Sequence, residues 1–102
     1  MSTNAKKILK KLNKGDLSFG DMLLTIRETD DITQADLAKK CRVSRGLICD
    51  IEKGRRLPTL EQVKIFAEKL GYPIQGFLAQ VLEDQLKSAN LKNYKVKVEA
   101  AS

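Results

Sequence analysis

The sequence predicts an all-α fold of five helices, and three observations support this prediction. Apolar residues recur three and four positions apart in five segments between residues 18 and 88, as they do on the buried face of an α-helix. Four of these segments begin at a residue that can cap a helix: Ser18, Thr33, Ser44 and Thr59. Two of them end beside a glycine, Gly54 or Gly71. We therefore expect helices over about residues 18–28, 33–41, 44–53, 59–70 and 73–88.

Two of these helix starts carry a stronger local signal. Ser18 with Asp21, and Thr59 with Gln62, have the spacing of capping boxes, in which each side chain bonds the backbone N–H of the other residue. Pro73 suits the start of the last helix because it has no N–H to leave unpaired. The helix boundaries are thus predicted from local chemistry as well as from apolar periodicity.

Bulk properties exclude several classes of protein. The 102 residues can bury one compact core. No apolar run approaches the ~18–20 residues that span a bilayer, and the basic N-terminus lacks the apolar stretch of a signal peptide, so we expect a cytoplasmic protein. Cys41 and Cys49 are the two cysteines, and the chain has no histidine. This rules against a disulfide framework or a closed zinc site, and we expect no cofactor. Cys41 is expected in the core.

Charge is distributed unevenly along the chain, whose net charge is +6. Residues 1–14 carry five lysines and no acidic residue. Acidic residues then concentrate over 16–36, whereas basic residues concentrate over 39–56: Lys39, Lys40, Arg42, Arg45, Lys53, Arg55 and Arg56. A segregated basic region of this kind is expected for a protein that binds a polyanion.

Two segments flank the predicted helical domain of residues 17–88. Residues 1–16 form a basic arm or short helix, and three roles stay open for it: a solvated tail, a DNA-backbone arm, or a helix packed on a partner. Residues 89–102 form a C-terminal tail in which apolar and charged residues alternate over 94–99, which predicts a short β-strand. Because a lone strand cannot satisfy its backbone hydrogen bonds, we expect the strand that carries Tyr94, Val96 and Val98 to pair with a second strand, from another copy of the chain or from a different protein.

The stretch from Thr33 to Arg56 has the pattern of a helix-turn-helix. Two short helical segments are joined by a tight turn and followed by a basic loop. Ala38 is small where two such helices cross, and Ile48 and Ile51 can anchor the second helix in the core. The other face of that helix presents Arg45, Gly46, Cys49 and Asp50. A helix held by apolar residues on one face only can enter the major groove of DNA.

Residues 17–78 as a whole resemble the helix-turn-helix family of phage repressors and Cro proteins, often named after the xenobiotic response element (XRE). Three stretches carry the resemblance, in the family's order and without gaps: LLTIRE, TQADLAKK and VSRGLICDIEKGRRLPTLEQVKIFAEKLGYPIQGFL. The resemblance implies a five-helix lambda-repressor-like DNA-binding domain, with double-stranded DNA as its partner.

The resemblance also assigns roles to matched positions. It implies contacts to the DNA backbone from Gln34, Ser44, Lys53, Arg55 and Arg56. It implies base reading by Arg45, Gly46, Cys49 and Asp50. Backbone contacts position such a protein, whereas base contacts carry the sequence information. Asp50 can either accept a hydrogen bond from cytosine or orient Arg45, and both readings stay open.

Three further positions follow from the same match. Arg27 and Glu52 imply a half-buried structural ion pair between the first helix and the end of the reading helix. Arg42 stands in the turn where relatives often carry glycine, so either its backbone is left-handed, with about 1–2 kcal/mol of strain, or the turn differs from theirs. Gly46 offers few contacts, so base preference is expected to depend on Arg45, a residue type that commonly pairs with guanine.

The residues show no catalytic pattern. The chain lacks histidine, a nucleophile beside a base, and a glycine-rich phosphate loop. The adjacent acids Asp30–Asp31 and Glu83–Asp84 point in different directions, so neither forms a catalytic pair. We predict no enzyme but a sequence-specific transcriptional regulator, a repressor that binds an inverted-repeat operator as a homodimer joined through the last helix and the strand. The alternative is an antitoxin that neutralises a protein toxin and represses its own operon. A phage lysogeny switch differs from these only in genomic context.

Overall fold

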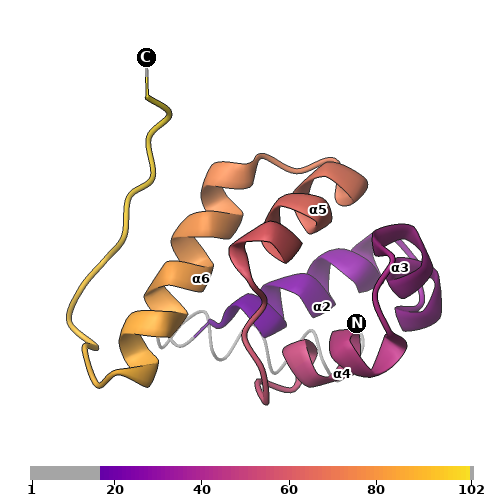
Figure 1. Cartoon of the computed structure of the whole chain (residues 1–102), viewed down its shortest axis with the longest axis horizontal. Coiled ribbons are helices and arrows are strands. Elements are labelled where there is room, and N and C mark those ends of the chain that lie inside the picture. Colours follow the sequence, from indigo (N-terminus) through magenta and orange to yellow (C-terminus); the bar gives the residue numbers. More distant parts are fainter. Residues whose placement is uncertain (1–16, 102) are drawn as a thin grey trace. The chain divides into compact units, whose positions relative to one another are not determined.

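Five α-helices account for the regular secondary structure of residues 17–101, which are the residues that the computed structural model describes (Figure 1). They are α2 (Phe19–Thr29), α3 (Gln34–Cys41), α4 (Arg45–Glu52), α5 (Leu60–Leu70) and α6 (Ile74–Ser88). The all-α prediction and the five helix positions are confirmed. The predicted basic segment, residues 1–16, lies outside the described residues.

The helices begin at the capping residues that the sequence predicted. The Ser18 hydroxyl accepts the Asp21 N–H at 3.1 Å, and the Asp21 carboxylate accepts the Ser18 N–H at 3.2 Å. Thr59 and Gln62 form the second capping box, with bonds of 3.1 and 3.0 Å. Both boxes satisfy N–H groups that a helix start otherwise leaves unpaired. At the other end of α5, Gly71 adopts the left-handed conformation, with φ of 77°.

The chain divides into two compact units that meet between Arg56 and Leu57. The first unit contains α2, α3 and α4, and the second contains α5, α6 and the C-terminal segment (residues 91–101). The predicted domain of residues 17–88 therefore comprises helices of both units. The buried apolar residues of the first unit are Phe19, Leu23, Leu37, Ala38, Cys41, Leu47, Ile48 and Ile51. Those of the second are Val63, Phe66, Ala67, Phe77 and Val81.

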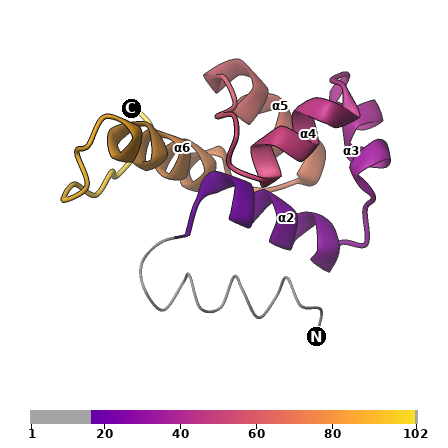
Figure 2. The same ribbon diagram turned by 90° about the horizontal axis from the view of Figure 1, so that it is seen from below.

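In the first unit, α4 packs on both α3 and α2, as Figure 2 shows. The approach of α2 to α4 is closest at Gly20, where an added Cβ atom would overlap the carbonyl oxygen of Ile51 and lie 3.1 Å from that of Glu52. Glycine is required here because these neighbours are backbone atoms, which cannot swing aside as a flexible side chain can. The sequence analysis placed a small residue between α3 and α4, at Ala38, and missed this second close crossing.

In the second unit, α5 and α6 form an antiparallel pair joined by a short loop. Val63, Phe66 and Val81 are fully buried. The ring of Tyr72 in the connecting loop stacks on Phe77, with centroids 6.0 Å apart and planes 19° apart. This contact anchors the loop to the first turn of α6.

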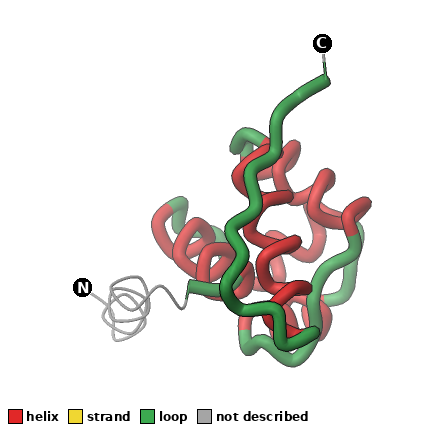
Figure 3. Tube along the Cα trace, turned by 90° about the vertical axis from the view of Figure 1, so that its left-hand side faces the viewer, coloured by secondary structure: helices red, strands yellow, loops and turns green. Residues whose placement is uncertain are grey.

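The predicted β-strand over residues 94–99 is wrong. Residues 91–101 have no regular secondary structure and run beside α6 (Figure 3). The chain reverses after α6 at Asn90, whose φ is 63°. The Val96 N–H then donates to the Glu83 carboxylate of α6 at 3.0 Å. A strand requires a partner strand, and here a side chain of α6 accepts the backbone N–H instead.

Candidate nucleic-acid interface

The turn between α3 and α4 depends on a left-handed arginine. Arg42 has φ of 56° and ψ of 43°. This conformation lets the Val43 N–H donate to the Ala38 carbonyl at 3.0 Å and so closes α3. Ser44 then starts α4 by accepting the Leu47 N–H on its hydroxyl at 3.0 Å. Of the two alternatives for Arg42, the structure shows the left-handed one, with a non-glycine residue where glycine is favoured.

Arg42→Gly is expected to raise the free energy of unfolding by about 0.5–1 kcal/mol. Glycine removes about 1–2 kcal/mol of left-handed strain but loses roughly 0.5–1 kcal/mol more conformational entropy on folding. Urea denaturation monitored by circular dichroism measures the difference. The matched control is Arg42→Ala, which removes the same charge and keeps the strain, and a glycine variant less stable than this control would contradict the expectation.

Helix α4 presents a narrow polar face. Its other side is buried through Leu47, Ile48 and Ile51. Arg45 and Gly46 are exposed, and Cys49 and Asp50 one turn later are half-buried. The first turn of α4 contains no acidic residue, whereas the first turns of α2, α3 and α5 each contain one. The positive end of the α4 dipole is therefore not neutralised by a neighbouring carboxylate and can attract an anionic ligand.

The loop after α4 is folded back onto the helix. Gly54 is left-handed with φ of 75°, and the Arg55 N–H donates to the Asp50 carbonyl at 2.9 Å. This turn brings the Arg55 guanidinium to 3.5 Å from the Asp50 carboxylate. Asp50 is thus paired with Arg55, a partner that the sequence analysis did not consider. The pair is exposed and weak, so either side chain can leave it for a ligand.

Three side chains converge at the end of α4 to fix its position. Arg27 of α2 donates twice to Glu52, from Nε at 2.7 Å and from Nη2 at 3.0 Å. The Gln34 amide nitrogen, at the start of α3, donates to Oε1 of Glu52 at 2.9 Å. Arg27 also donates to the Ile32 carbonyl at 3.0 Å. Glu52 is only 8% exposed, so these bonds tie all three helices of the first unit together in a partly dry environment.

The hydrogen bond to Glu52 raises the pKa of Arg27, while burial of the guanidinium works in the opposite direction. A group whose folded-state pKa is raised stabilises the fold below its unfolded-state pKa and loses that contribution only as pH rises through the folded value. For an arginine this window lies above any ordinary working pH. Arg27 is therefore a permanent cation in the network.

A family model described as helix-turn-helix matches residues 23–77, which include all of α3, the turn, α4 and α5. The chain belongs to the helix-turn-helix family of the XRE type.

Two similar proteins extend this assignment. The immunity repressor protein of Bacillus phage phi105 is 27% identical over 81 residues, covering 78% of this chain and 56% of the repressor. The chain thus spans little more than half the length of that relative. The crystal structure of the clp gene regulator ClgR from Corynebacterium glutamicum has a TM-score of 0.57 and 26% identity, covering 71% of this chain and 78% of that chain.

In this helix-turn-helix protein, the positions expected at the DNA backbone lie in two places of the first unit. A hollow at the start of α3 is lined by Arg27, Thr33, Gln34, Ala35 and Arg45. The loop after α4 carries Lys53, Arg55 and Arg56, all exposed. The hollow includes Arg45 from the first turn of α4, and the loop follows the last turn, so basic side chains lie near both ends of this helix. The sequence analysis assigned Gln34 to the DNA backbone and did not identify Glu52 as a partner of its side chain.

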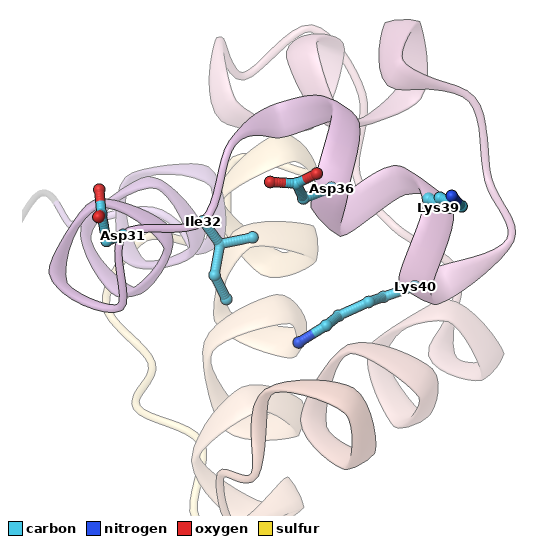
Figure 4. Close-up of a pocket in the computed structure, with 5 residues that line it drawn as sticks. All are labelled: Asp31, Ile32, Asp36, Lys39 and Lys40. Carbon is cyan, nitrogen blue, oxygen red and sulfur yellow. The ribbon is translucent and has the colours of Figure 1, made fainter.

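A second depression, shown in Figure 4, lies between the α2–α3 loop and the outer side of α3. Its lining residues are Asp31, Ile32, Asp36, Lys39 and Lys40. The two acids and two lysines are exposed, and their charges oppose one another. Such a mixed surface selects neither an anion nor a cation.

Within residues 17–101, no three metal-ligating side chains lie together. Cys41 is buried in the core, as predicted, and Cys49 is half-buried on α4. Neither cysteine forms a disulfide bond. No helix among the described residues is long and apolar enough to cross a membrane.

Proposed function

We propose that this protein is a sequence-specific DNA-binding transcriptional repressor. The observation that carries the proposal is α4 itself, a short helix locked in place through Glu52, buried on one face and presenting Arg45, Gly46, Cys49 and Asp50 on the other. A helix of this kind can enter the major groove with its N-terminal turn leading. The phi105 immunity repressor and the ClgR regulator, by their names, support regulation as the role.

In the proposed complex, polar and cationic groups near both ends of α4 bind the DNA backbone. One phosphate lies at the hollow and meets the Gln34 side chain at the start of α3. Ser44 contributes its hydroxyl at the start of α4. Lys53, Arg55 and Arg56 follow the backbone beyond the other end of the helix. These contacts orient α4, and base preference comes from its exposed face.

The proposed form is a cytoplasmic homodimer on an inverted repeat, with its two reading helices ~34 Å apart, one helical turn of DNA. Exposed apolar side chains suited to a dimer contact lie after α6: Leu91 is 43% exposed and Tyr94 is 62% exposed. Val96 and Val98 of the same segment are half-buried. The dimer represses by occupying the operator and blocking access to it.

Selection of bound sequences from a random DNA pool at about 0.15 M salt tests the proposal, since purely electrostatic binding is weak under that condition. An inverted repeat is the expected result. A single half-site would contradict the dimer and leave the reading helix in place. Recovery of no sequence motif would overturn the DNA-binding function.

Arg45→Ala is expected to weaken binding to the selected site by about 1–3 kcal/mol and to relax preference at one base pair of each half-site. The reason is the loss of a bidentate contact from an exposed arginine at the leading end of α4. Repeating the selection with the variant measures both effects. Lys53→Ala is the control. Loss of a phosphate contact should weaken binding to all DNA sequences alike, and it should lower the number of ions released on binding by about one. An unchanged base preference in the Arg45 variant would contradict its role.

The second candidate, an antitoxin, is favoured by one observation: the C-terminal segment carries exposed Leu91 and Tyr94 with lysines between and after them. Such a surface fits a protein partner. Co-expression with the product of the neighbouring gene distinguishes the two functions. A stable complex that is lost with Tyr94→Ala would establish the antitoxin role, and a neighbour that neither binds nor harms cells would exclude it.

A further inference from the structure

Among the glycines that the structure describes in the first unit, Gly46 is the one with no structural requirement for glycine. At Gly20 a Cβ atom would overlap backbone, and at Gly54 the φ of 75° favours glycine, so both glycines have structural reasons. At Gly46 the backbone is helical, and the nearest atom that a Cβ would meet is the Ser44 hydroxyl at 3.9 Å, an ordinary van der Waals distance. Glycine in a helix lowers stability relative to alanine. The free protein therefore gains nothing from having glycine at this position.

The position of Gly46 on α4 indicates which group could occupy the space that its missing side chain leaves open. Helix geometry places residues three and four positions later on the same face, so Gly46 shares its face with Cys49 and Asp50. Both have short side chains, which reach a base edge only if the helix axis lies close to the floor of the groove. A side chain at Gly46, on the leading turn of the same face, would hold the helix away from that floor.

We infer that Gly46 is a specificity-determining residue that acts through its missing side chain. The edge of a base pair in the major groove occupies the space beside its Cα atom. This close approach brings Cys49 and Asp50 within reach of base edges, while the longer Arg45 reads from the side. The inference rests on the proposed DNA-binding function and deepens it, because it assigns base reading to contacts that no long side chain makes.

Gly46→Ala tests the inference because it separates stability from binding. In the free protein we expect the melting temperature to rise by about 4 °C, as for a glycine replaced by alanine in an uncrowded helix. For the selected DNA site we expect binding weaker by roughly ten- to hundredfold, the effect of forcing one methyl group into a close-packed contact. A repeated selection should also show reduced preference at the base pairs nearest Cys49 and Asp50. Gly46→Leu should weaken binding further than Gly46→Ala.

Gly76→Ala is the matched control. Gly76 is also helical and exposed, and a Cβ there would meet no atom within 4 Å, but it lies in α6 rather than in α3 or α4. It should raise the melting temperature in the same way and leave DNA affinity unchanged, once sedimentation has shown that both variants keep the wild-type oligomeric state.

The outcomes separate this inference from the proposed function. If the wild type selects a DNA site and Gly46→Ala binds that site as tightly or more tightly, the inference is wrong and the proposed function stands. If the wild type selects no site, the proposed function and the inference fall together. If Gly46→Ala lowers the melting temperature instead, the glycine has a structural role in the free protein and the inference is overturned.

Discussion

Glu52→Ala is expected to lower the free energy of unfolding by about 3–5 kcal/mol, the largest effect of any single substitution considered for this protein. The carboxylate is 8% exposed and accepts hydrogen bonds from Arg27 and Gln34. Its removal leaves the Arg27 guanidinium, whose side chain is 13% exposed, without its charge partner. Arg27 stays charged in this variant because an arginine side chain keeps its proton at any ordinary pH, even without a charge partner. An unpaired, largely buried cation then destabilises the first unit.

Chemical denaturation of Glu52→Ala and of two control variants tests this prediction. Glu68→Ala removes an exposed glutamate of α5 and should change stability by less than about 0.5 kcal/mol. The double variant Arg27→Met with Glu52→Leu removes both charges and should recover a large part of the loss, since no charge remains buried. A loss below about 1 kcal/mol for Glu52→Ala would show that the pair behaves as a weak surface ion pair.

The helices were predictable because their signals are local. Ser18, Thr33, Ser44 and Thr59 each cap a helix by bonding an N–H three residues ahead, so a short stretch of sequence contains both partners. The strand over 94–99 was not predictable in this way. Its alternating pattern is equally local, but strand formation depends on a partner far away in the sequence. In this structure the Val96 N–H donates a hydrogen bond to the Glu83 carboxylate of α6 instead.

The candidate site shows the same division. The outward face of α4 follows from helical periodicity and from the burial of Leu47, Ile48 and Ile51. The partners of Glu52 and Asp50 do not follow from periodicity. Arg27 and Glu52 are 25 positions apart, and only the match to a family pointed to their pairing. The Asp50–Arg55 contact depends on the left-handed Gly54, whose exact turn the sequence analysis read only as a helix stop.

Gly20→Ala is expected to lower the free energy of unfolding by about 3 kcal/mol, the upper end of what one added methyl group does in a packed interior. The added Cβ would overlap the Ile51 carbonyl oxygen and lie 3.1 Å from that of Glu52. Because both atoms belong to the backbone at the end of α4, relief requires α2 and α4 to separate. That movement also stretches the bonds between Arg27 and Glu52, so two stabilising features weaken together.

Thermal and urea unfolding of Gly20→Ala beside Gly76→Ala measure this effect. Both replace a helical glycine, and helix propensity alone favours alanine by about 1 kcal/mol at each position. Gly76 has no atom within 4 Å of an added Cβ, so its variant should be more stable than the wild type, whereas the Gly20 variant should be less stable. The same replacement of glycine by alanine is thus expected to raise the free energy of unfolding at Gly76 and to lower it at Gly20. If both raised stability, α2 and α4 would not be in the close contact that fixes the end of the reading helix.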